Sequence, residues 1–142
     1  MQISANLPQF KKGTALLVVS GDFEVDFYLA TNGEIAKADS MLVGKTNPLI
    51  TSGFVVNESG GSKNLKVARH AEFLNAFKKH LTYLLSKSAV EETHMFAPAE
   101  VKNELQAALP AKLKKCLKVY EGNFHKEHPF KLLEKIAFLP AE

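Results

Sequence analysis

Two adjacent glycines run directly into a basic segment near the middle of the chain. The segment reads Gly60-Gly61-Ser62-Lys63-Asn64-Leu65-Lys66-Val67-Ala68-Arg69. Glycine lacks a Cβ and can expose its backbone amides, and the unpaired N–H groups at the start of a following helix favour a nearby anion. Such a loop can approach a phosphate or an ester closely, whereas the alternative is a flexible turn that joins a strand to a helix. With three basic residues beside it, the glycine pair predicts a contact with RNA.

A second group of basic residues comprises Lys112, Lys114, Lys115 and Lys118. If both basic groups lie on one side of the sheet, they can follow the phosphate backbone of a nucleic acid. The chain has 18 Lys and Arg against 15 Asp and Glu, a net charge of +3, which permits an acidic partner without requiring one. The alternative is an ordinary solvated surface, because lysine is common on any surface and no aromatic residues are interleaved with these lysines.

Ser62 places a hydroxyl directly after the glycine pair. A serine nucleophile requires a base and an orienting acid, but no Gly-x-Ser-x-Gly pattern surrounds Ser62 and the sequence pairs no histidine with it. We therefore do not expect a serine hydrolase. The Ser62 oxygen can instead accept a hydrogen bond from a backbone N–H in the first turn of the helix, as an N-cap residue does.

Histidines offer a second kind of chemistry. His125 and His128 flank an acidic residue, but no cysteine pair and no further ligands at zinc spacing accompany them, so we favour a turn or a helix cap over a metal site. His70 and His80 fall within a predicted helix, and we interpret them as hydrogen-bonded residues at the edge of the core. We expect no metal and no cofactor.

Length and composition are those of one ordinary domain covering residues 1–142. Cys116 is the single cysteine, so it has no internal disulfide partner, and its position in a predicted buried strand predicts an inert thiol. The first residues lack the basic start and the apolar run of a secretion signal, and no apolar stretch is long enough to cross a bilayer. We therefore expect a soluble protein in the cytoplasm, without a membrane partner.

Three strands are expected in the first third of the chain. Residues 14–20 form a continuous apolar run, which is typical of a strand covered on both faces. Residues 23–29 alternate between apolar and polar side chains and lead to the Asn-Gly pair at 32–33, which suits a tight hairpin turn. Residues 34–43 return as a less regular third strand, and residues 54–56 form either a short strand or a buried loop anchor.

Helices and strands alternate in the remainder of the chain. Residues 63–88 carry apolar side chains at helical spacing with polar residues opposite, which predicts one long, half-buried helix. Residues 94–96 and 116–120 are predicted strands, separated by a helix that begins near Pro98 and that Pro110 ends or restarts. A closing helix is predicted from Pro129, with a buried stripe of Phe130, Leu133, Ile136 and Ala137.

This order of elements indicates a fold class. A meander of three antiparallel strands followed by two helix-strand units gives an α/β fold with a mixed five-stranded sheet and helices packed on it, since right-handed crossovers place the later strands parallel. The order is the ribonuclease H-like one. Its nuclease members hold metal ions on carboxylates within the sheet, yet residues 14–20 contain no Asp or Glu, so we do not expect a metal-dependent nuclease. The unpaired edge strand of such a sheet can pair with a second copy of the chain, so a homodimer is a further alternative.

The glycine segment resembles the catalytic middle domain of archaeal and eukaryotic peptide-chain release factors, in which Gly-Gly-Gln precedes a basic, amphipathic helix. The matching residues are Gly60, Gly61, Leu65, Ala68 and Arg69, and Lys66 keeps a basic character. Residues 96–105 resemble the strand-to-helix turn of that domain and of its Pelota relatives. The chain is also similar in size to the bacterial single-domain relatives, including the proteins required for attachment to host cells. The resemblance covers the chain from Gly60 to its end, and before that it depends on strand order alone.

This resemblance implies an RNA- or ribosome-associated factor related to translation, with the ribosome or tRNA as its partner. In release factors the glutamine of the motif helps to place a water molecule for attack on the ester of peptidyl-tRNA, and Ser62 stands at that position here. A serine hydroxyl can still donate and accept a hydrogen bond, so weak hydrolysis is one alternative. The alternative that we favour is a domain that keeps the fold but has lost the reaction. A hypothesis of another class is a non-catalytic interaction or host-attachment module that binds a protein or a small ligand.

Overall fold

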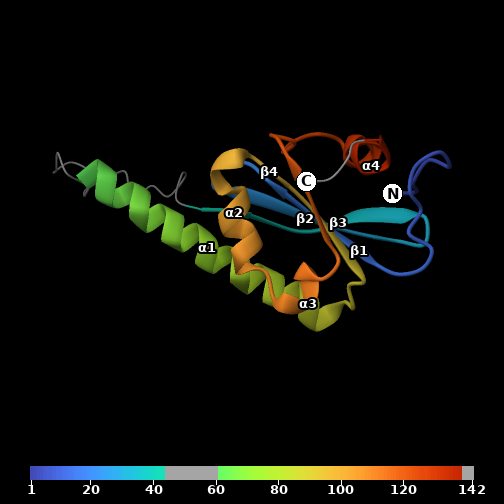
Figure 1. Cartoon of the computed structure of the whole chain (residues 1–142), viewed down its shortest axis with the longest axis horizontal. Coiled ribbons are helices and arrows are strands. Elements are labelled where there is room, and N and C mark those ends of the chain that lie inside the picture. Colours follow the sequence, from blue (N-terminus) through green and yellow to red (C-terminus); the bar gives the residue numbers. More distant parts are fainter. Residues whose placement is uncertain (44–60, 139–142) are drawn as a thin grey trace.

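The structure is a computed structural model, which describes the backbone of residues 1–43 and 61–138 and the side chains of residues 1–43 and 70–138. The element predicted at residues 54–56 therefore lies outside the described residues. Figure 1 shows the elements in chain order: β1 (Ala15–Ser20), β2 (Glu24–Thr31), β3 (Glu34–Leu42), α1 (Gly61–Lys87), β4 (Glu92–Ala97), α2 (Ala99–Ala108), α3 (Ala111–Lys114), β5 (Leu117–Glu121) and α4 (Pro129–Phe138).

The strands form one mixed five-stranded sheet in the order β3-β2-β1-β4-β5. β2 pairs antiparallel with both β1 and β3, whereas β4 pairs parallel with both β1 and β5. β1 is the central strand, and all of its residues are buried, as its continuous apolar run predicts. The predicted α/β fold, with three antiparallel strands followed by two helix-strand units, is confirmed.

Two tight corners define the meander. Asn32 and Gly33 have positive φ angles of 49° and 81°, the conformation of a type I′ hairpin turn, as the Asn-Gly pair predicts. The corner between β1 and β2 differs from the prediction, because Phe23 has a φ angle of 59° and the strand begins at Glu24. The Phe23 ring instead packs edge-on against Phe73 of α1, with ring centroids 5.8 Å apart.

β3 and β5 are the two edges of the sheet. Phe27 and Tyr28 of β2 lie opposite Asp39 and Lys37, so Ala38 is an extra residue in β3, a β-bulge. Bulges twist an edge strand away from regular pairing with another chain. A homodimer through an edge strand stays a prediction.

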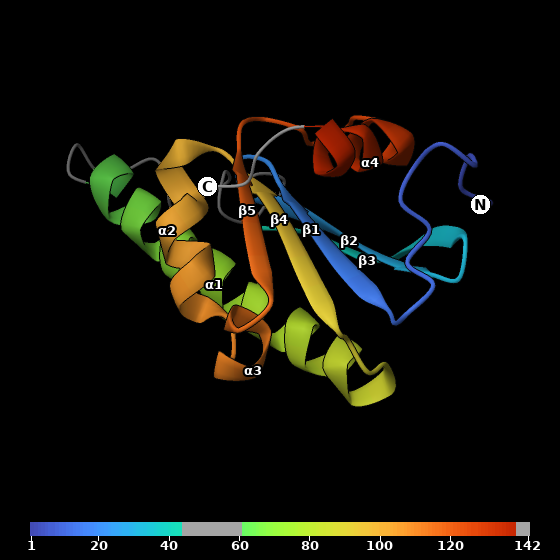
Figure 2. The same ribbon diagram turned by 45° about the vertical axis from the view of Figure 1, so that its right-hand side comes forward.

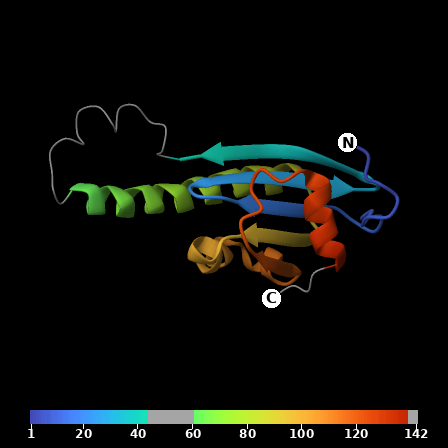
Figure 3. The same ribbon diagram turned by 90° about the horizontal axis from the view of Figure 1, so that it is seen from above.

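Three helices, α1, α2 and α3, cover one face of the sheet (Figure 2). α1 contributes four side chains at helical spacing to the larger core cluster: Phe73, Phe77, Leu81 and Leu84. The Phe77 ring stacks on Phe27 of β2, with centroids 5.8 Å apart. The first part of α1 extends beyond the ends of the strands (Figure 3). Across residues 1–43 and 61–138, no helix combines the length and the apolar character needed to span a membrane.

The opposite face is covered by the N-terminal segment and by α4. Leu132 and Leu133 are the buried residues of α4, while Phe130 and Ile136 pack at the border of the second core cluster. The predicted stripe is wrong in part, because Ala137 is exposed and Leu132 takes an inward position. Figure 3 shows the reason: α4 crosses the strands, so the middle of the helix lies over the sheet and its last turn does not.

Cys116 is exposed and precedes β5, so the prediction of a buried thiol in that strand is wrong. α3 ends at Lys114, and the N–H of Cys116 still donates to the carbonyl of Leu113 at 3.3 Å. Because the chain is still turning at this point, the Cys116 side chain does not take the inward direction of a strand residue.

Candidate nucleic-acid interface

The glycine segment is only partly described. Gly60 lies outside the described residues, and Gly61 is the first residue of α1. The side chains of Ser62, Lys63, Lys66 and Arg69 also lie outside the described residues. The functional interpretation of these six residues therefore stays a prediction.

α3 presents lysines on both sides of one buried residue. Pro110 is its N-cap residue and follows the end of α2, so it both ends one helix and opens the next. Leu113 is only 2% exposed and fixes the turn to the core. Lys112, Lys114 and Lys115 are exposed, and together they form what we call the α3 lysine group.

Lys118 does not join the α3 lysine group. It lies opposite His94 in the pairing of β5 with β4, and its charge acts on that histidine. Both residues share a face with Tyr120, which belongs to the second core cluster. Lys118 therefore lies on the face of the sheet away from α1, α2 and α3.

Two nearby acidic residues, Glu104 and Glu121, are paired with other bases. Glu121 accepts a hydrogen bond from Lys102 Nζ at 2.8 Å, and Glu104 pairs with His70 of α1. In the part of the chain that the structure describes, none of the three lysines of the α3 group forms an ion pair. Their positive charge is uncompensated at short range, which is what a phosphate-binding surface requires.

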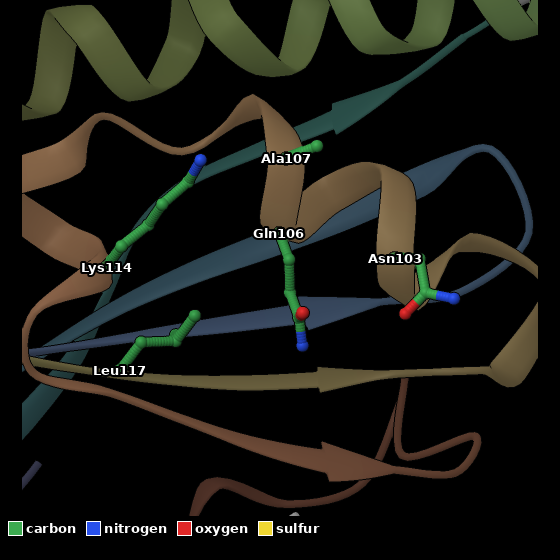
Figure 4. A pocket seen from close by; sticks show the side chains of 5 residues that line it. All are labelled: Asn103, Gln106, Ala107, Lys114 and Leu117. Atoms are coloured by element: carbon green, nitrogen blue, oxygen red, sulfur yellow. The ribbon is translucent and has the colours of Figure 1, made fainter.

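A hollow of about 370 Å³ lies beside the α3 lysine group, among α2, α3 and the start of β5. Its lining, shown in Figure 4, comprises Asn103, Gln106, Ala107, Lys114 and Leu117. The three α2 residues stand three and four positions apart and share one face of the helix. The sequence does not predict this hollow, because polar residues at such spacing are typical of any solvated helix face. Only the position of these α2 residues beside α3 distinguishes them from an ordinary solvated face.

The two predicted basic groups are separated along α1. α1 and α3 lie on the same face of the sheet, but Lys118 of the second predicted group lies on the other face, so the prediction of a side shared by both complete groups is wrong. Figures 1 and 2, however, place the first turn of α1 and the short helix α3 far apart, toward different ends of α1. The 27 residues of α1 span about 40 Å at the rise of an α-helix. One RNA contact to both groups therefore has to be an extended one.

His94 is a buried histidine in β4, which the sequence identified only as a strand residue. Its side chain is 2% exposed, with Nδ1 3.1 Å from the Tyr120 hydroxyl and Nε2 2.6 Å from a Glu92 carboxylate oxygen. Burial lowers the pKa of His94, and its hydrogen bond to Glu92 opposes that shift. Burial also raises the pKa of Tyr120. This group is a packed hydrogen-bonded network and leaves its imidazole closed to solvent.

The remaining histidines take structural positions. His125 lies in a turn and bridges two carboxylates of β2, with Nδ1 3.0 Å from Glu24 and Nε2 3.3 Å from Asp26. His128 Nδ1 accepts a hydrogen bond from the N–H of Phe130 at the start of α4. The predicted turn and helix cap are therefore confirmed. Among the described residues, no group of three or more His, Cys, Asp and Glu side chains is arranged to hold a metal ion.

His70 and His80 of α1 are half-buried, as predicted for the edge of the core. His70 pairs with Glu104 of α2, and His80 Nδ1 lies 2.5 Å from a carboxylate oxygen of Asp39 in β3. The His80 ring also stacks on Phe27, with centroids 6.3 Å apart. These contacts connect α1 to its neighbours and use both imidazoles for packing.

The fold is similar to that of a solved archaeal protein of known function. The crystal structure of the archaeal translation termination factor aRF1 matches with a TM-score of 0.53 and 12% sequence identity, over 87% of this chain and 37% of that chain. A second solved structure, described as an archaeal protein, matches over the same shares with 12% identity and a TM-score of 0.47. No family model and no curated protein matches the sequence. At this identity the likeness shows the fold, a mixed α/β domain like one found in a release factor.

Proposed function

We propose that this domain is a cytoplasmic, RNA- or ribosome-associated factor of translation that binds RNA through its basic surfaces. The observation that carries the proposal is the α3 lysine group, which is exposed and has no acidic partner among the described residues. Its charge suits a phosphate backbone. The similarity in fold to aRF1, a translation termination factor, supports the same class of function. The resemblance to Pelota relatives and to host-attachment proteins stays a prediction.

The glycine segment extends this proposal. Gly61 is the first residue of α1, Gly60 precedes it in the sequence, and Lys63, Lys66 and Arg69 follow. Such a helix start favours phosphate. In the proposed complex the glycine segment and the α3 lysine group contact separate stretches of one RNA, with Lys118 adding charge on the other face of β5.

Ester hydrolysis is the reaction to test. By the resemblance, Ser62 stands where release factors carry glutamine, and a serine side chain is shorter than a glutamine side chain. We expect binding of tRNA or ribosomes with at most slow hydrolysis of peptidyl-tRNA. A Ser62→Gln variant is the matched comparison: a gain in hydrolysis over the parent chain indicates a competent loop, and its absence indicates a binding domain without the reaction.

Sedimentation with ribosomes tests the proposed association. The chain is centrifuged with purified ribosomes at about 50 mM and about 200 mM salt. We expect the chain in the ribosomal pellet at low salt and its release at the higher salt, because phosphate contacts release counterions. If the chain stays in the supernatant at both salt concentrations and also fails to bind free RNA, the proposal is wrong and a non-nucleic-acid interaction module takes its place.

A further inference from the structure

We propose that the hollow among α2, α3 and β5 holds an unstacked nucleobase, so that the domain selects single-stranded RNA over duplex RNA. The inference rests on the RNA binding proposed above and adds a site and a class of ligand to it. The hollow measures about 370 Å³, which falls within the range of about 300–1,000 Å³ typical of small-ligand pockets. It is open to solvent at a surface that already carries exposed lysines.

Two carboxamides supply the uncharged polar part of the hollow. Figure 4 shows Gln106 extending from α2 toward the strands, with Leu117 on one side and Asn103 on the other. Within the described ranges, neither carboxamide has a hydrogen-bond partner in the protein. Each offers both donors and an acceptor, which matches the mixed donor and acceptor edge of a base. A fully ionised inorganic anion or purely acidic ligand carries no N–H or O–H group that could donate a hydrogen bond to the two carboxamide oxygens.

Apolar carbon supplies the rest of the lining. Ala107 belongs to the same face of α2, and the Leu117 side chain lies across from it at the start of β5. The flat face of a base can pack against such aliphatic groups while its edge meets the carboxamides. A base that is still paired in a duplex presents neither its face nor its pairing edge, so it cannot enter.

Charge around the hollow fits the phosphates on either side of that base. Lys114 lines the hollow itself, and the exposed Lys112 and Lys115 lie within two residues of Lys114 in the chain. At the far end of β5, the Lys102–Glu121 ion pair joins α2 to the strand and neutralises the acidic residue there. The ion pair thus holds two walls of the hollow together, and Lys114 is the charged residue in its described lining. We infer a nucleotide segment with its base inside and its backbone on the lysines.

The test compares a labelled single-stranded RNA of about ten nucleotides with the same sequence in a duplex, by fluorescence anisotropy. The full chain is compared with an Asn103→Ala, Gln106→Ala double variant. The matched control is a Gln2→Ala, Asn75→Ala double variant, which removes two exposed carboxamides elsewhere. We expect the parent and the control to prefer the single strand, and the hollow variant to lose about tenfold or more in affinity for it. Its salt dependence stays unchanged, because no charge is removed.

The outcomes separate this inference from the proposed function. If the parent chain binds neither RNA, the proposed function fails. If the parent binds RNA in a salt-dependent manner but the hollow variant binds as tightly as the control, or the parent binds both RNAs equally, RNA binding stands and the nucleobase pocket is wrong. The inference is also overturned if an acidic peptide competes with the RNA and its own binding depends equally on Asn103 and Gln106, because the hollow then recognises protein.

Discussion

Replacing Lys112, Lys114 and Lys115 together by alanine removes the α3 lysine group and leaves its anchor, Leu113, in place. All three lysine side chains are exposed, and the ion pairs described in the structure do not involve them. Alanine is at least as good a helix former as lysine, so we expect the variant to fold. The substitution therefore tests the charge of this surface with little change elsewhere.

The size of the effect follows from counterion release. Each phosphate neutralised on a single strand contributes about 0.7 to the slope of log affinity against log salt, so three contacts contribute about 2. Between about 50 mM and 200 mM salt, a slope difference of 2 corresponds to about a 16-fold difference in affinity. The parent chain should therefore lose about 16-fold more affinity than the variant over that interval.

Fluorescence anisotropy with a labelled single-stranded RNA measures both slopes. The matched control is a Lys11→Ala, Lys12→Ala, Lys131→Ala variant, which removes the same charge from exposed positions on the segments that cover the opposite face. We expect a reduced slope for the α3 variant and a slope close to that of the parent for the control. Equal slopes for the two variants refute the assignment of the contact to α3, because net charge alone then explains the effect.

Three further predictions concern the fold. Phe77→Ala removes a fully buried ring stacked on Phe27 and should lower the free energy of unfolding by about 3–5 kcal/mol in urea denaturation, whereas Tyr83→Ala, at a 56% exposed position, should cost less than about 1 kcal/mol. Burial holds the pKa of His94 below its ordinary 6.5, so the unfolded chain binds a proton at a higher pH than the folded chain does. The free energy of unfolding should therefore fall as pH drops below about 6.5, and a His94→Gln variant should show a smaller fall. Identical pH profiles for the parent and the variant argue against His94 as the source of this pH dependence. Gly33→Ala places a Cβ at a φ angle of 81° and should lower the free energy of unfolding by about 1–2 kcal/mol. An unchanged free energy of unfolding in urea denaturation means that the hairpin turn has adopted another type.

Local patterns predicted most of the fold because each depends on short-range physics. The apolar run at residues 14–20 marks the fully buried β1, and the Asn-Gly pair at 32–33 has the positive φ angles that its turn requires. The spacing of apolar residues in α1 predicted the face that packs on the sheet. These signals are present in neighbouring residues, so one sequence suffices to find them.

Other features depend on how distant segments meet. Ala137 was predicted inward, but α4 crosses the strands and its last turn leaves the sheet, a geometry that helical spacing does not encode. Asn103 and Gln106 are candidate ligand-binding residues only because α3 and β5 complete a hollow around them. Likewise, Lys118 follows the other lysines in sequence, yet the alternation of side chains along β5 sends it to the opposite face.

Amide chemical shift mapping by NMR tests the proposed RNA-binding surface most directly. A labelled sample of the full chain is titrated with the same single-stranded RNA at low salt, and shift changes are followed along the backbone. We expect the largest changes at residues 103–118, which comprise the α2 face, α3 and the start of β5, with smaller ones at the start of α1. Changes confined to β3 and α4, or no changes at saturating RNA, contradict the assignment of RNA binding to this surface.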